Sequence, residues 1–265
     1  MKTYKWVGSE RTFIDDINIL ELDHMVVGRF GGNSSAGQTK NEDGCLVWVN
    51  LEEGWEFAVI LDAHDSTESA ELVVTTIDSM KQYIMDCLTE PLPQSFKSME
   101  TNIVETFQSK AFLEKCKQVK GETACLFVAR KQNYLWWLSI GDCPLYVHHP
   151  ELARLSEYQQ NHRSFFEWIG KNSTFHQGVP SYSSGIKQLR QGETHIFMTT
   201  DGLIECPNTS YSNPEEIFKM FKAKTTKNGV QSLLEEIAKK GVRDSTTILS
   251  WKVYNEKDAV MPSDS

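Results

Sequence analysis

The sequence lacks the cysteine patterns of disulfide-rich and zinc-binding proteins. Its six cysteines, at positions 45, 87, 116, 125, 143 and 206, form no CxxC pair. Several stand inside apolar runs such as "ETACLFVAR". We therefore expect buried, reduced thiols rather than a disulfide framework or a zinc site.

Membrane and secretion signals are also missing. No apolar run is long enough to cross a bilayer. The first residues, "MKTYKWVGSERTF", contain no apolar core of a secretion signal. These absences predict a cytoplasmic protein that does not contact a membrane.

The chain has no surplus of basic residues. Its 27 Lys and Arg are outnumbered by 36 Asp and Glu, which gives a net charge of -9. A general nucleic-acid binder relies on Lys and Arg to neutralise phosphates, so we expect no nucleic-acid partner. With 265 residues and 40% hydrophobic residues, the chain can bury a sizeable core.

Short apolar runs bounded by turn residues predict strands. "CLVWVNL" and "WEFAVIL" flank "EEG", and "TACLFVAR" and "YLWWLSI" flank "KQN", so each pair predicts an antiparallel hairpin. Further strands are expected at "HMVVGRF", "PLYVHH", "THIFMTT" and "STTILSWKVY".

Helical spacing of apolar residues begins at Ser66 and predicts a helix that ends before "EPLP". Asp65 and Glu68 have the spacing of a capping box at its start. Other helices are expected over 94–117, 213–222 and 228–240. Hairpin-linked strands with interspersed helices predict an α+β layered domain with antiparallel sheets and helices on their outer faces. We expect one domain over 1–254, with 150–185 as a flap or insertion and 255–265 as a tail.

Carboxylates mark the ends of the predicted strands. Any one of them is explained by the preference of Asp for turns and helix caps. As a set that converged on one edge, they would repel one another unless cations neutralised them. Oxygen-rich sites of this kind select Mg²⁺ or Mn²⁺, and pairs of these ions are used by phosphatases and nucleases. The candidates are Asp62, Asp142, Asp201, Asp244 and the pair Glu42–Asp43.

An ordered series of motifs resembles the metal-dependent, type 2C (PPM-type) serine/threonine protein phosphatases. The series is "KNEDG", "FAVILDAHD", "GETACLFVA", "LSIGDCPLYV", "IFMTTDGLIE" and "RDSTTILSWKV", and it covers roughly residues 25–254. The resemblance implies a divergent, bacterial-like member. It also implies that family's fold, an antiparallel β-sandwich flanked by α-helices on both outer faces, in α-β-β-α layers, with a binuclear metal centre at one edge.

The resemblance further implies ligands for two Mg²⁺ or Mn²⁺ ions. Asp62 would bridge both ions, and Ala63 would offer its backbone carbonyl where the family has glycine. Asp201 and Asp244 would bind one ion. Three more acids complete the implied set: Glu42, which would hold the other ion through water, Asp43 nearby, and Asp142, which in some members helps to hold a third ion.

His64 is the candidate proton donor. Imidazole titrates near pH 6.5, so it can supply a proton to a leaving alkoxide at neutral pH. The alternative is a turn histidine that contacts solvent or Asp65.

The sequence departs from the family near the expected phosphate-binding position. Gln38 stands where the family carries arginine. Lys40 is close enough to substitute as a point charge, although it lacks the planar fork of arginine and is also explained as a solvated loop lysine. Asp65 and Ser66 replace a small glycine pair and add negative charge, and Pro144 stands where some members carry arginine.

These features favour a phosphomonoesterase that hydrolyses phosphoserine or phosphothreonine in proteins by direct attack of metal-activated water. No cysteine lies in a phosphate-cradling loop, which disfavours a cysteine nucleophile. The alternative is a non-catalytic, phosphatase-like binding or regulatory module. A metal-dependent nuclease is disfavoured by the acidic balance. We expect a monomer whose partner is a phosphorylated protein.

Overall fold

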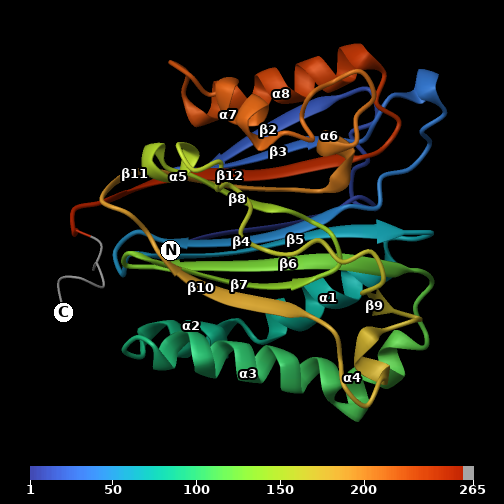
Figure 1. The fold of residues 1–265 in the computed structure, drawn as a ribbon. Helices are drawn as coiled ribbons and strands as arrows, with labels where there is room; N and C mark the ends of the chain where they lie inside the picture. The colour runs from blue at the N-terminus through green and yellow to red at the C-terminus, as the bar shows by residue number, and fades with distance from the viewer. Residues whose placement is uncertain (259–265) are drawn as a thin grey trace.

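The computed structural model describes residues 1–258 and contains two antiparallel sheets stacked face to face, with helices on both outer faces (Figure 1). This four-layered α-β-β-α arrangement confirms the predicted fold class. The larger sheet has the order β1 (Lys2–Val7), β4 (Gly44–Asn50), β5 (Trp55–His64), β6 (Glu122–Lys131), β7 (Tyr134–Ile140) and β10 (Ser183–Gln188), and β9 (Ile169–Gly170) pairs with β6. The smaller sheet has the order β2 (Ile17–Leu22), β3 (Met25–Phe30), β12 (Thr246–Asn255), β11 (Gly192–Thr199) and β8 (Leu145–His148).

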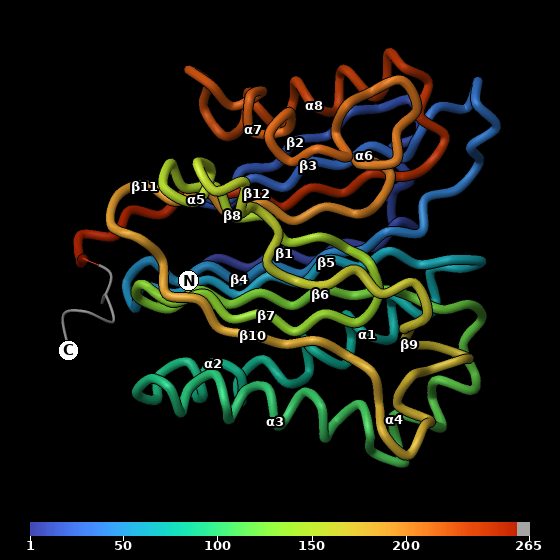
Figure 2. Tube along the Cα trace, in the orientation of Figure 1, coloured from blue at the N-terminus to red at the C-terminus, as the bar shows by residue number. Residues whose placement is uncertain are grey.

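The helices divide between the two sheets, as the chain trace shows (Figure 2). The larger sheet is covered by α1 (Glu68–Ser79), α2 (Lys81–Thr89), α3 (Gln94–Gln108) and α4 (Lys110–Cys116). The smaller sheet is covered by α6 (Asp201–Ile204), α7 (Pro214–Lys219) and α8 (Thr226–Lys240), and the short α5 (Pro150–Ala153) follows β8. No helix within residues 1–258 is long and apolar enough to cross a membrane.

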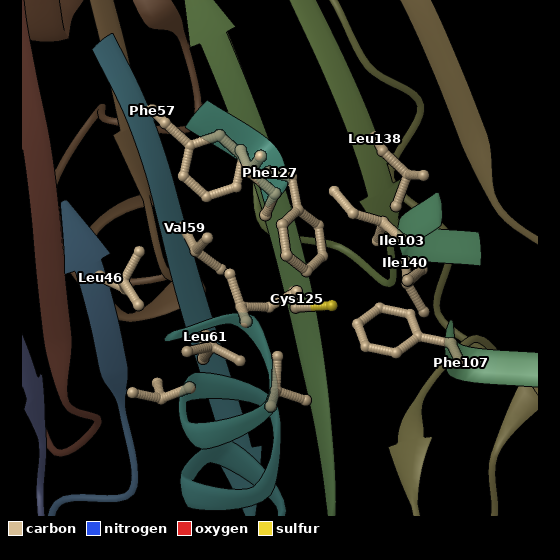
Figure 3. Packing of buried hydrophobic residues seen from close by; sticks show 14 of the residues in the cluster. Leu46, Phe57, Val59, Leu61, Ile103, Phe107, Cys125, Phe127, Leu138 and Ile140 are labelled. Atoms are coloured by element: carbon tan, nitrogen blue, oxygen red, sulfur yellow. The ribbon is translucent and has the colours of Figure 1, made fainter. Parts of the chain in front are cut away.

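Strand β5 explains how the layers are held together. Phe57, Val59 and Leu61 point towards the helices, where they pack near Ile103 and Phe107 of α3 (Figure 3). The alternate residues, Ala58 and Ile60, point into the core between the sheets. Because both faces of this strand are buried, its sequence is a continuous apolar run rather than an alternating one.

The predicted hairpins β4–β5 and β6–β7 are confirmed by their antiparallel registers. Strand β5 is longer than expected, because Asp62 and His64 still pair with Ala124 and Glu122 of β6. Four strands were not predicted from the sequence: β1, β2, β9 and β10. All six cysteines are buried and free, as predicted.

The predictions of two long helices are each wrong in one respect: each predicted helix is two separate helices in the structure. The first breaks at Met80 and the second at Ser109, whose hydroxyl accepts a hydrogen bond from Phe112 N and starts α4. The prediction over 228–240 was nearly correct, since α8 begins two residues earlier and closes at Gly241 with a left-handed φ of 72°. The prediction over 213–222 corresponds to the shorter α7.

Residues 150–185 form short elements that contact both sheets: Gln159 pairs with Tyr146 of β8 in the smaller sheet, and β9 pairs with β6 in the larger one. Ile169 and Phe175 are buried, and the Phe175 ring lies 5.5 Å from that of Phe107. By contrast, Phe165, Phe166 and Val179 are exposed. Of the predicted tail, 259–265 lie outside the described residues, and Asn255 still belongs to β12.

We expect replacement of Leu46 by alanine to lower the free energy of unfolding by about 2–5 kcal/mol, because it leaves a cavity between β4 and the helices. Leu46 is fully buried in this layer (Figure 3). Leu51→Ala is the matched control, since Leu51 is 57% exposed, and its effect should stay within about 0.5 kcal/mol. Urea denaturation of both variants measures the difference, and equal losses would contradict the assignment of this core.

Candidate metal centre

Five aspartates, one from a strand and four from connections, converge at one edge of the sandwich. Asp62 comes from β5, and Asp142 follows β7. Asp201 is the first residue of α6, directly after β11, while Asp43 and Asp244 lie just before β4 and β12. The backbone N–H of Asp201 donates to Asp62 Oδ2 at 3.4 Å, which links the two sheets at this edge.

A close backbone contact brings Asp201 beside Asp244. A Cβ added to Gly202 would lie 2.1 Å from the carbonyl oxygen of Ser245. A side chain is therefore excluded at Gly202, and the first turn of α6 rests directly on the backbone that precedes β12. This contact explains the glycine in "TTDGL".

Asp43 lies deepest in the cluster and is 2% exposed. Its Oδ2 accepts hydrogen bonds from the hydroxyls of Thr200 and Thr247, at 3.0 and 2.7 Å. Burial raises the pKa of Asp43 well above its ordinary value, the two threonine hydrogen bonds oppose this, and the charges of Asp244 and Asp201 add to it. Asp43, just before β4, is thus hydrogen-bonded to Thr200, which follows β11, and to Thr247 near the start of β12.

The electrostatics of Asp62 and Asp201 show how closely the acids approach one another. Burial, followed by the charges of Asp201, Asp43, Asp244 and Asp142, raises the pKa of Asp62 well above its usual range. Burial and the charges of Asp244 and Asp142 raise the pKa of Asp201 to about 6. Both acids are therefore destabilised as carboxylates by burial and by the negative charges of their neighbours.

The donor set fits a hard divalent cation. Asp201 Oδ1 is buried and accepts no hydrogen bond from any of residues 1–258. Asp142, Asp201 and Glu205 also offer carboxylate oxygens that lie within 4.8 Å of one another. Carboxylate oxygens without imidazole or thiolate ligands suit Mg²⁺ or Mn²⁺, and the positive charge of such an ion would relieve the repulsion among these acids.

The remaining predicted residues lie beside this cluster. The Lys40 ammonium is 2.8 Å from the Glu42 carboxylate and 3.3 Å from the Asp65 carbonyl oxygen. Gln38 Oε1 accepts from the neighbouring Thr39 N–H. Ala63 is buried in β5, whereas the adjacent His64 is exposed.

Comparison with known proteins gives matches in structure alone. No family model matches the sequence, and no curated protein matches it significantly. A bacterial serine phosphatase with an Arg-to-Glu substitution superposes with a TM-score of 0.63 at 14% identity, over 96% of this chain and 98% of that one. RsbX in complex with magnesium gives 0.57 at 14% identity, over 89% of this chain and 100% of that one. The catalytic domain of the serine/threonine phosphatase PstP with 2 manganese ions gives 0.56 at 15% identity, over 89% and 99%.

The chain has the fold of the type 2C serine/threonine phosphatases. In this type 2C fold, the aspartate cluster lies at the edge of the sandwich where the C-terminal ends of β5 and β11 meet. The superposition shows the fold, and at identities of 14–15% it shows the fold alone.

The predicted role of Asp65 as a helix cap is wrong. Helix α1 begins at Glu68 with Thr67 as its N-terminal flanking residue, and the Glu68 N–H donates to Ser66 Oγ at 3.1 Å. Asp65 instead adopts a left-handed φ of 74°, and its carboxylate lies 3.3 Å from Lys120 Nζ. A tight turn between β5 and α1 therefore takes the place of a capping box in this type 2C fold.

Two charged residues of the edge were not found from the sequence. Glu205 lies four residues after Asp201, so the i, i+4 spacing in "DGLIE" could have indicated it. Arg163 donates to the Asp142 carbonyl oxygen at 2.8 Å and lies 3.0 Å from Glu205. Arg163 comes from the irregular segment 150–185, where no periodic signal points to it.

We expect the metal-free protein to lose stability as the pH rises from about 4 to above 6. Asp201 has a folded pKa near 6 against an ordinary 3.8, so the folded state holds an extra proton in this window, and its stabilising effect disappears as that proton leaves. Asp201→Asn should flatten this fall by about 1–3 kcal/mol.

Urea denaturation in EDTA at pH 4.5 and pH 7.5 measures the effect. Asp86→Asn, at an exposed helical position, is the control and should follow the wild type. Equal pH dependence in the wild type and Asp201→Asn would show that Asp201 is not destabilised by its neighbours.

Proposed function

We propose that this protein is a Mg²⁺- or Mn²⁺-dependent phosphomonoesterase that hydrolyses phosphoserine or phosphothreonine in proteins. The observation that carries the proposal is the convergence of five aspartates at one edge, where Asp62, Asp43 and Asp201 all have raised pKa values. The structural similarity to serine/threonine phosphatases, among them structures with magnesium or manganese, supports the same reaction class. We further propose that the protein acts as a cytoplasmic monomer.

The aspartates would hold two ions, with Asp62 shared between them. Asp201 and Asp244 would hold one ion, and the Ala63 carbonyl with Glu42, acting through water, would hold the other. Asp43 would help to position the neighbouring metal ligands through its hydrogen bonds to Thr200 and Thr247. Asp142 would contribute to a third ion with Asp201. Bound ions supply a lowered pKa of water and a positive clamp on the phosphoryl oxygens.

His64 would donate the proton to the leaving oxygen of the substrate. It follows Asp62 by two residues on β5 and is exposed at the end of this strand. No hydrogen bond to its ring is observed among residues 1–258, so the imidazole is available to an incoming group. An imidazole is a common general acid in enzymes that work at neutral pH.

Phosphate binding would rest mainly on the ions. Gln38 has no charge, and Lys40 is engaged with Glu42 at 2.8 Å. We propose that Lys40 contributes to phosphate binding only where it exchanges Glu42 for the substrate. A low affinity for phosphate in the absence of metal follows from this arrangement.

Asp62→Ala should abolish Mn²⁺-dependent hydrolysis of p-nitrophenyl phosphate and of a phosphothreonine peptide. We expect a loss of about a thousandfold or more in kcat, because several kcal/mol of transition-state stabilisation disappear with the shared ligand. Asp86→Asn is again the control and should retain wild-type activity. A wild-type protein that binds Mn²⁺ without turnover would support the non-catalytic alternative, and activity that does not depend on Asp62 would refute the site.

His64→Ala should impair substrates in proportion to the basicity of their leaving group. Hydrolysis of phosphothreonine, whose threonine alkoxide is a poor leaving group, should fall by about 10²-fold or more, whereas hydrolysis of p-nitrophenyl phosphate, with its good leaving group, should change little. Steady-state kinetics on both substrates give the ratio. An equal effect on the two would indicate that His64 does not act as the proton donor.

A further inference from the structure

A short segment beside the metal centre exposes two aromatic side chains. Phe165 is 57% exposed and Phe166 is 85% exposed. They belong to "RSFFEW", residues 163–168, which we call the 163–168 segment. Large apolar side chains that are exposed together on a protein surface commonly mark a contact surface.

The 163–168 segment is attached to the aspartate edge at two points. At its start, Arg163 donates to the Asp142 carbonyl oxygen at 2.8 Å, and the Ser164 N–H donates to the Gly141 carbonyl oxygen at 3.0 Å. Towards its end, the Glu167 carboxylate lies 3.4 Å from the Gly141 N–H. The two phenylalanines between these contacts are therefore fixed beside Asp142. The Cα atom of Phe166 is at most about 8 Å from that of the anchored Ser164.

Internal contacts orient both rings. The Arg163 guanidinium lies 5.1 Å from the centre of the Phe165 ring, and the Phe166 ring meets that of Trp168 edge-on at 6.2 Å. Arg163 thus joins the acids of the edge to the aromatic pair, because it also contacts Glu205 at 3.0 Å. A surface held in this way loses little conformational freedom when a partner binds.

We propose that the 163–168 segment is a substrate-docking surface that selects phosphorylated residues flanked by bulky apolar side chains. This proposal rests on the proposed phosphatase function, since a phosphoryl group bound at the aspartate edge brings its flanking residues to Phe165 and Phe166. The charge of the surroundings agrees with an apolar rather than an acidic flank, because Asp142, Glu167 and Glu205 all lie at this position.

The test uses two phosphothreonine peptides of equal length and net charge, one with leucine and phenylalanine next to the phosphorylated residue and one with serine at these positions. The wild type should prefer the apolar peptide. In the double variant Phe165→Ser/Phe166→Ser, kcat/KM for the apolar peptide should fall about tenfold through KM, as expected for the loss of an apolar anchor. Hydrolysis of the serine peptide and of p-nitrophenyl phosphate should be unchanged.

Leu155→Ser is the matched control. Leu155 is 74% exposed and follows α5, at the other end of β8 from Asp142, so its replacement should leave the preference for the apolar peptide intact. Far-UV circular dichroism checks that all variants are folded. An unchanged preference in the double variant would overturn the proposal, as would a change in oligomeric state without a change in preference, which would identify a contact between copies.

Binding separates this proposal from the proposed function. Fluorescence anisotropy with the same peptides in EDTA does not require turnover. The wild type should bind the apolar peptide more tightly, and the double variant should bind both peptides equally. A protein that shows this difference but hydrolyses nothing would retain the docking surface and lose the phosphatase assignment. Equal binding of both peptides by the wild type would refute the docking surface.

Discussion

Repulsion among carboxylates at one edge is the constraint on which the rest of this structure depends. Asp43 and Asp62 are almost fully buried, and each has its pKa raised by burial and by the other acids. Like charges separated by about 4–5 Å near a protein surface repel by roughly 3–4 kcal/mol per pair. The surrounding layers must hold these groups together against this repulsion.

The layers hold the edge in place through strands that are buried on both faces. In β5, the residues before Asp62 alternate between the helix-facing core and the core between the sheets, so the strand cannot slip by one residue without moving both sets. Thr200 and Thr247 act at the smaller sheet, where their hydroxyls satisfy one buried oxygen of Asp43. Close packing in the larger sheet and hydrogen bonds at the smaller sheet thus both oppose the repulsion among the carboxylates.

Much of this arrangement could be predicted because its signals are local. Hairpins follow from apolar runs and short turns, and an aspartate directly after an apolar strand is visible in "FAVILD" and "IFMTTD". The breaks at Met80 and Ser109 could not be predicted from periodicity, because the apolar spacing continues across them. The left-handed turn at Asp65 and the contact of Arg163 with Asp142 also escaped prediction. The latter joins residues 21 positions apart without a repeating pattern.

Three cations near this edge are paired with acids, and this affects how an anionic substrate can bind. Lys40 is paired with Glu42, Lys120 lies near Asp65, and Arg163 contacts both Asp142 and Glu205. A phosphate dianion that approaches the edge therefore meets carboxylates, and these three cations already contact carboxylates of the protein. Bound divalent ions, which carry more charge than any one side chain, would supply attraction, and so would contacts to the remainder of the substrate. Phe165 and Phe166 offer contacts of this second kind, which gain free energy from apolar burial and are insensitive to the charge of the edge.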